Sequence, residues 1–452
     1  MPTPLCDALR AFARQDGLRM HMPGHKGKPL PVPELADAAP LDFTELAPTG
    51  NLFDGDGPIR QAEDLWSEAL GMEQCLFLTG GSTQGIYAAL TLCCPPGSSF
   101  LMDRGCHRAV YHAAALLDLH PEFLSRPWQE KEGLLGPISP EQVASALDAH
   151  PNCKTICITS PTYYGVLSDI PAIAAAVHQR GGKLVVDAAH GPHLFFLGDR
   201  SLSAADVVVL SAHKTLPALG QSALLMANGF SHGDLRRAAG LYGSSSPSYV
   251  MMASLDGARD YLLGRGGQDY ALAAERVAGL RMQFPSLQPR AGFALDPTRL
   301  TLMAKDGPAA ARRLEAAGVW PEMEDQNHVV LIVTCMDTPQ DLDRLEAVLH
   351  QNADAWGMPE GRPGRMEPPP EPETVLSPRK ARFAPVRRLP LEQAEGAVSA
   401  CQVAPYPPGV PVIAPGERIT KKALAYLNKV GYNMKQEIEL VSMLPTERED
   451  FA

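Results

Sequence analysis

The chain has 452 residues, 45% hydrophobic and 20% charged, which is the composition of a soluble globular protein too long for one ordinary core. A formal net charge of −11 argues against a nucleic-acid partner, and the lack of an apolar run of ~18 residues argues against a membrane partner. The charged N-terminus has no apolar signal core, so we expect a cytoplasmic protein. The nine cysteines are scattered, and Cys153 and Cys157 share an apolar run without a second pair. They indicate reduced core thiols and no metal site.

The first half of the chain alternates short apolar runs with helical stretches. Residues 1–17 predict a helix, because Leu5, Leu9 and Phe12 recur at helical spacing. Beyond it, apolar and β-branched runs predict strands at 75–78, 99–103, 153–160, 183–186 and 207–209. Helices between these strands imply a mostly parallel sheet, whose strands deliver the residues that follow them to one edge. We therefore expect an α/β major domain.

Polar side chains follow three of these strands. The turn Gly80–Gly85, which contains Ser82 and Thr83, offers backbone N–H groups and hydroxyls at the start of a helix, as a phosphate site does. Many such turns only cap helices, so this signal is weak alone. Asp187 follows a second strand, and Lys214 comes just after a third. A carboxylate and a lysine at the ligand-binding edge of an α/β sheet suggest a site for pyridoxal phosphate.

The second half of the chain changes character after residue 285. A long helical stretch at 251–284 precedes alternating strands and helices, which predict a small α+β unit. The proline-rich run 361–372 has no means of burying a core and indicates a linker. We divide the chain into an N-terminal helix and arm (1–30), a cofactor-binding major domain (31–285), a small α+β domain (286–358), a proline-rich linker (359–375) and a C-terminal α+β domain (376–452).

Eight motifs, in order over nearly the whole chain, resemble the Orn/Lys/Arg decarboxylase family in its short form, which lacks an N-terminal wing domain. They are HMPGHKG (21–27), LDFTEL (41–46), GGSTQG (80–85), SPTYYG (160–165), DAAHG (187–191), SAHKT (211–215), SSSPSY (244–249) and PYPPGVP (405–411). Each motif alone is weak, but eight in order argue strongly against coincidence. The resemblance implies a pyridoxal phosphate-dependent enzyme of aminotransferase-like fold type I.

The resemblance also implies roles around the cofactor. Lys214 would bind it as a Schiff base, and Asp187 would pair with the pyridine nitrogen and keep it protonated. On the two faces of the ring, His107 would stack and Ala189 would pack, while His190 would support Asp187. The residues that would hold the phosphate are Gly81, Ser82, Thr83, Ser211 and His213.

A second subunit enters through the loop that contains Ser245. In the family this loop reaches the phosphate of a neighbouring subunit, which implies a homodimer with a shared active site.

The implied reaction is the decarboxylation of a basic amino acid to an amine that feeds polyamine synthesis. Lys214 or His213 would protonate Cα after carbon dioxide leaves, so the catalytic set is Lys214, Asp187, His213 and His107. Arginine is favoured over lysine or ornithine from the short-form resemblance alone. The acidic candidates for reading the distal cation of the substrate are Glu45, Asp54 and Glu324.

Two alternatives remain. An aminotransferase-like or β-eliminating enzyme would require a firm arginine clamp for the substrate carboxylate. The candidates Arg379, Arg382, Arg387 and Arg388 lie in a proline-broken stretch in which none can be assigned. A catalytically silent regulatory relative would be indicated by loss of Lys214 or Asp187, and both are present.

The chain departs from the family pattern at two places. Ala188 stands where many members carry glutamate, and GAVSA at 396–400 lacks an arginine of the usual sequence. Both departures leave the choice of substrate open.

Overall fold

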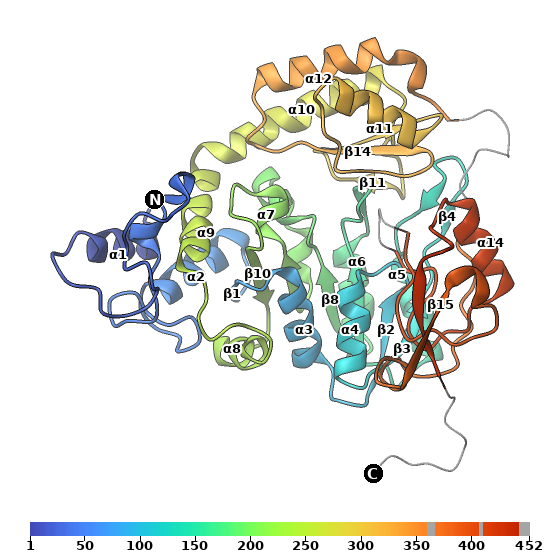
Figure 1. Ribbon diagram of the computed structural model, residues 1–452, viewed down its shortest axis with the longest axis horizontal. Helices are drawn as coiled ribbons and strands as arrows, with labels where there is room; N and C mark the ends of the chain where they lie inside the picture. Colours follow the sequence, from blue (N-terminus) through green and yellow to red (C-terminus); the bar gives the residue numbers. More distant parts are fainter. Residues whose placement is uncertain (359–366, 406–409, 443–452) are drawn as a thin grey trace.

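A computed structural model describes residues 1–358, 367–405 and 410–442 of the chain. Figure 1 shows a central sheet with helices around it, a small domain at the top of the view and a C-terminal domain at the right. The expected linker at 359–375 and the motif at 405–411 lie partly outside the described residues.

A seven-stranded sheet forms the centre of the major domain. Its strands lie in the order β1 (Gln74–Leu78), β10 (Ala223–Ala227), β9 (Val207–Leu210), β8 (Lys183–Asp187), β6 (Thr155–Thr159), β2 (Ser99–Asp103) and β3 (His120–Leu124). The strands from β9 to β3 pair in parallel, whereas β10 is antiparallel to both of its neighbours. The predicted α/β fold with a mostly parallel sheet is confirmed. The sequence pattern missed β3 and β10.

Helices connect these strands and bury the sheet. They are α2 (Gly57–Leu70), α3 (Gly81–Cys93), α4 (Arg108–Leu116), α5 (Pro140–Ala149), α6 (Ile170–His178), α7 (Ala212–Thr215) and α8 (His232–Gly240). Helix α3 packs on β8, β9 and β10, and against α4 and α8. Its Gly85 permits this close approach, because a Cβ there would lie 2.6 Å from Cγ1 of Val209.

A long helical segment leads from the major domain to the small domain. The stretch expected at 251–284 consists of α9 (Tyr249–Tyr261), a π-helical turn at Leu262–Gly266 and α10 (Gly267–Gln283). The small domain contains an antiparallel sheet in the order β12 (Arg299–Met303), β14 (His328–Ile332) and β13 (Met323–Glu324). Helices α11 (Gly307–Ala316) and α12 (Pro339–Gln351) share its apolar core with α10.

The C-terminal domain contains α13 (Pro378–Arg382), β15 (Val386–Pro390), α14 (Lys421–Lys429) and β16 (Glu437–Val441). It has an apolar core of its own, and α13 packs against α4 of the major domain. At the other end, α1 (Pro4–Ala13) buries Leu5 and Leu9 in the major core. Two short antiparallel pairs complete the described strands: β4 (Trp128–Gln129) with β5 (Leu134–Leu135), and β7 (Val166–Leu167) with β11 (Ala294–Leu295). In the described part of the chain, no helix is long and apolar enough to cross a membrane.

Candidate active site

The ends of the sheet strands bring the predicted cofactor residues to one edge. Strand β8 ends at Asp187, which pairs with Val209 of the parallel strand β9. The short helix α7 follows β9 and carries Lys214. Across the sheet, β1 leads into α3 with Ser82 in its first turn, and His107 follows β2 as the N-cap of α4. The connectivity therefore gathers residues that are far apart in the chain.

A cavity of about 1000 Å³ opens at this edge. Six of the predicted site residues line it: Ser82, His107, Asp187, Ala189, His190 and Lys214. The small domain contributes Glu324 and Asp325 to the wall, and the C-terminal domain contributes Val412 and Tyr426. Three domains thus surround one site.

Lys214 and His190 are in direct contact at the base of the cavity. The Lys214 Nζ atom lies 3.0 Å from Nε2 of His190, whose ring packs against the ring of Tyr163 with centroids 4.3 Å apart. Burial lowers the pKa of Lys214, while the charges of Asp187 and Glu322 act in the opposite direction. Burial, and then the Lys214 charge, lower the pKa of His190 well below its usual value.

Asp187 is buried at the end of β8. Its Oδ1 accepts a hydrogen bond of 3.1 Å from the Ala189 amide, which fixes the carboxylate. Burial raises the pKa of Asp187, and the Lys214 charge opposes this shift. A buried carboxylate of this kind is stabilised by a cation, and a protonated pyridine ring supplies one.

His107 presents a neutral ring to the cavity. Its Nδ1 accepts a hydrogen bond from the Ala109 amide at 3.2 Å and so caps α4. The ring can be reached from the cavity, yet enough protein surrounds it that desolvation, with the charges of Lys214 and Arg108, lowers the pKa of His107 to about 4. An uncharged ring at neutral pH suits stacking on an aromatic cofactor.

The predicted phosphate residues are distributed between two helix starts. Gly81 begins α3 with φ +71°, a left-handed conformation that favours glycine, and it turns the chain into the helix next to Ser82. Ser211 precedes α7, and its buried Oγ has no hydrogen-bond partner among the described residues. Thr83 is exposed, and Nδ1 of His213 donates to the Ser222 carbonyl oxygen at 2.9 Å. Gly81, Thr83, Ser211 and His213 are not among the residues that line the cavity.

Ser245 lies outside the cavity, in an exposed loop between α8 and α9. Its predicted contact with a phosphate therefore requires a second subunit and remains a prediction.

Three acidic residues of the small domain line the cavity, and they differ in their partners. Asp325 accepts hydrogen bonds from His328 Nδ1 at 3.0 Å and from the Tyr164 hydroxyl. Asp306 caps α11 through the Ala309 amide. The Glu324 carboxylate has no hydrogen-bond or ion-pair partner in the described part of the chain, so it is available to a ligand. Glu45 and Asp54 are not part of the wall.

Comparison with known proteins matches two segments of the chain to one family. Residues 3–293 match the Orn/Lys/Arg decarboxylase major domain, and residues 366–436 match its C-terminal domain. The chain belongs to the Orn/Lys/Arg decarboxylase family. It is therefore a pyridoxal phosphate-dependent amino-acid decarboxylase that acts on a basic amino acid.

Full-length similarity extends to several relatives. The chain is 32% identical to the protein YaaO of Bacillus subtilis (strain 168), over 97% of this chain and 96% of that one. It is 30% identical to the arginine decarboxylase of the same organism, over 94% of this chain and 93% of the relative. The lysine decarboxylase LdcF of Francisella novicida has a similar fold, with a TM-score of 0.82 at 20% identity, over 97% of this chain and 81% of that structure.

The residues of this Orn/Lys/Arg decarboxylase site fit pyridoxal phosphate. Lys214 and the buried Asp187 share one cavity, as an amine for the aldehyde and a carboxylate for the ring nitrogen require. The unpartnered Ser211 hydroxyl and the start of α3 are suited to an anion. We therefore expect these groups to hold the cofactor.

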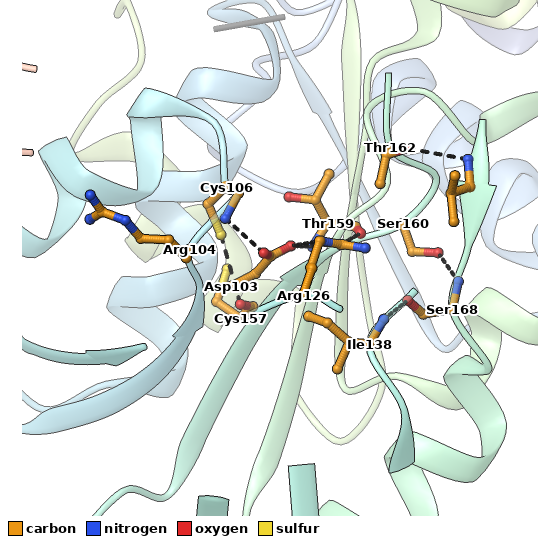
Figure 2. A network of polar contacts seen from close by, with 12 residues as sticks. Asp103, Arg104, Cys106, Arg126, Ile138, Cys157, Thr159, Ser160, Thr162 and Ser168 are labelled. Atoms are coloured by element: carbon orange, nitrogen blue, oxygen red, sulfur yellow. Dashed lines mark hydrogen bonds and ion pairs between the residues drawn. The ribbon is translucent and has the colours of Figure 1, made fainter. Parts of the chain in front are cut away.

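The decarboxylase cavity contains one arginine, Arg126, in the part of the chain that the structure describes, and its charge is already paired. Figure 2 shows Arg126 beside Asp103, whose Oδ2 accepts from Arg126 Nε at 2.9 Å and from Nη2 at 2.6 Å. Arg126 Nη1 donates to the Gly136 carbonyl oxygen at 3.0 Å. This arginine is not free to clamp a substrate carboxylate.

The arginines considered for such a clamp also lie elsewhere. Arg379 donates to backbone carbonyls of α4, while Arg382 and Arg388 pair with Glu439. Arg387 lies in β15 and is not part of the cavity wall. The geometry thus disfavours the aminotransferase-like alternative.

Sequence reasoning missed Arg126 and Arg299. Arg126 lies in the loop between β3 and β4, and Arg299 begins β12, so only the tertiary structure brings them to the site. An arginine at the start of a buried strand, as at Arg299, was the available signal.

Proposed function

We propose that this enzyme decarboxylates arginine to agmatine, which feeds polyamine synthesis, with lysine and ornithine as weaker substrates. The observation that carries the proposal is the cavity that combines Lys214 and Asp187 with the unpartnered carboxylate of Glu324. The choice of arginine is supported by relatives that match this chain over nearly their whole length and are named arginine decarboxylases.

Lys214 would hold the cofactor through Nζ, and Asp187 would bind the protonated ring nitrogen. When bound, pyridoxal phosphate supplies an electron sink for the pair of electrons left at Cα as carbon dioxide departs. His107 and Ala189 would pack the two faces of the ring. Gly81, Ser82, Thr83, Ser211 and His213 would hold the phosphate, with Ser245 contributed by a partner subunit.

The proton that replaces the carboxylate would come from Lys214 rather than His213. Lys214 lines the cavity, whereas His213 directs its Nδ1–H to a backbone oxygen and is not part of the wall. His190 would keep the Lys214 amine in place through the 3.0 Å contact. Among the described residues the one arginine that lines the cavity, Arg126, is paired with Asp103, so the departing carboxylate would be loosely held, which avoids stabilising the ground state.

Glu324 would read the distal cation of the substrate. A hydrogen bond to a charged group contributes about 1.5–3 kcal/mol, so Glu324→Gln should raise KM for arginine by roughly ten- to a hundredfold. Asp54→Asn is the control, because Asp54 is exposed and lies outside the cavity. An effect of Asp54→Asn without one of Glu324→Gln would show that the cation binds outside this cavity and not at Glu324.

The substrate is tested by incubating the holoenzyme separately with arginine, lysine and ornithine and identifying agmatine, cadaverine or putrescine. We expect agmatine to form fastest. If lysine or ornithine gives the highest kcat/KM, the arginine assignment is wrong. Lys214→Ala should lose the visible absorbance of the lysine-bound cofactor, and a variant that retains it would refute the role of Lys214.

We further infer a homodimer in the cytoplasm. The dimer would supply Ser245, which one chain alone leaves outside its cavity. All nine cysteines lie in the described residues and are free, and eight of them are buried, as suits a reducing compartment. Sedimentation equilibrium tests the dimer, and a monomer with full activity would refute the shared site.

A further inference from the structure

Arg299 connects the small domain to the catalytic lysine through one histidine. It is the first residue of β12, and its side chain is 1% exposed. Arg299 Nη2 lies 3.4 Å from Nδ1 of His190, and Nη1 donates to the Tyr163 carbonyl oxygen at 3.3 Å. His190 Nε2 in turn lies 3.0 Å from Nζ of Lys214. A chain of three side chains therefore ends at the amine that is to bind the cofactor.

The chemistry of these groups decides where the protons lie. A guanidinium only donates hydrogen bonds and stays charged in proteins, so Nδ1 of His190 must accept from Arg299. A histidine whose Nδ1 accepts is neutral and carries its proton on Nε2. The Nε2–H group then faces Nζ of Lys214, which can accept a hydrogen bond from it only through a free lone pair. The contact is thus compatible with an uncharged amine and not with an ammonium group.

We propose that Arg299 is a positioning residue, which fixes the tautomer of His190 so that Nε2–H donates to Lys214 and holds its amine in the uncharged, nucleophilic form. The inference rests on the proposed role of Lys214 in binding the cofactor, and it concerns the protein before the cofactor binds.

The surroundings of Lys214 show why such a device is useful. Asp187 and Glu322 face the lysine and favour its charged form, whereas burial and the Arg299 charge favour the free amine. Burial and the Lys214 and Arg299 charges likewise lower the pKa of His190, with His107 and His193 acting in the same direction. The Arg299 charge is itself supported by Asp296, whose Oδ2 lies 3.9 Å from Nε. Arg299 thereby counteracts the carboxylate that the cofactor ring requires.

Binding of the cofactor as a Schiff base requires an uncharged lysine amine. The Nζ lone pair would form a bond to the aldehyde carbon of pyridoxal phosphate, and the aldehyde oxygen would leave as water with both amine protons. An ammonium group has no lone pair for this step, so the rate of capture follows the fraction of free amine.

The tautomer can be measured in the cofactor-free wild-type protein, without any activity. Nitrogen-15 NMR of histidine-labelled protein distinguishes protonated from unprotonated ring nitrogens, and the signals that disappear in His190→Gln assign His190. We expect Nε2 protonated and Nδ1 unprotonated at pH 7. A proton on Nδ1, or on both nitrogens, overturns the proposal, and this holds even if Arg299 variants fail to fold.

The link to Lys214 is tested by the pH dependence of cofactor capture, followed by visible absorbance after mixing cofactor-free protein with pyridoxal phosphate. Arg299→Met should move the midpoint upward by about one pH unit and slow capture at pH 7 about tenfold. The matched control is Arg281→Met, because Arg281 is a buried arginine that donates to the Asp296 and Arg299 carbonyl oxygens but does not contact His190.

The outcomes separate this inference from the proposed function. An unchanged midpoint in Arg299→Met, or an equal shift in Arg281→Met, overturns the role of Arg299 while leaving the Schiff-base lysine intact. If Lys214→Ala still binds the cofactor with the usual visible absorbance, the proposed function is refuted. That result would not change the His190 tautomer measured by NMR in the wild-type protein.

Discussion

The ion pair between Arg104 and Glu417 is expected to hold the C-terminal domain on the cofactor cavity. Arg104 follows β2, and its Nη2 donates to Glu417 Oε2 at 2.8 Å and to the Val412 carbonyl oxygen at 3.2 Å, while Nη1 binds the other Glu417 oxygen. The two side chains are 12% and 4% exposed. Glu417 also accepts from the Ala414 amide at 2.8 Å, so the pair fixes the segment whose Val412 lines the cavity.

Removing one partner leaves the other charge buried without compensation. Such a loss costs about 3–5 kcal/mol, whereas replacing both partners by apolar residues is often close to neutral. We expect Arg104→Met to weaken the docking of the C-terminal domain by roughly two to four orders of magnitude. The double variant Arg104→Met/Glu417→Met should recover most of this loss.

Hydrogen exchange of residues 410–442 measures docking, with the major-domain sheet as the internal reference. Arg382→Met is the matched control, because its pair with Glu439 is 46% and 28% exposed and should contribute no more than about 1 kcal/mol. Unchanged exchange in Arg104→Met, or a double variant as destabilised as the single one, would refute the reasoning.

Three further perturbations concern residues of the major domain. Burial raises the pKa of Glu63 from its ordinary 4.5 to about 8, against the lowering effects of the Phe77 amide and nearby arginines. The contribution of Glu63 to the free energy of unfolding should therefore be greatest at and below pH 4.5 and should fall by about 1.4 kcal/mol per pH unit as the pH rises toward 8. Urea unfolding of Glu63→Gln at a series of pH values should not show this fall. His107→Phe should lose the α4 cap and about 1 kcal/mol of stability but keep its affinity for the cofactor. His107→Asn should keep the cap and the stability but lose cofactor affinity. Thermal melting measures the stability, and absorbance titration with the cofactor measures the affinity. Gly85→Ala should destabilise the protein by about 1–3 kcal/mol, because the added Cβ would clash with Val209. Gly279→Ala in α10 should stabilise it by up to about 1 kcal/mol, because a Cβ there would have no atom within 4 Å. Equal melting temperatures of the two variants would contradict the packing argument.

Local pattern was enough to predict the parallel part of the sheet and the residues at its edge. The apolar residues of β8 and β9 are buried, β8 ends at Asp187, and the turn to Lys214 follows β9, so sequence position alone indicates that the two residues lie close together. The direction of β10 was not predictable, because an antiparallel insertion has the same composition as its neighbours. The same limit applies to the cavity wall, since Glu324 and Val412 reach it only through the packing of separate domains.

The positions that depart from the family pattern lie away from the chemistry. Ala188 is fully buried in the major core, where a glutamate side chain would be desolvated, and it is not part of the cavity wall. Ala397, in the segment that lacks the family's arginine, packs against the core of the C-terminal domain. Neither side chain is part of the cavity wall. We therefore expect substrate preference to depend on the wall that the small and C-terminal domains form together, where the Glu324 carboxylate has no partner among the described residues.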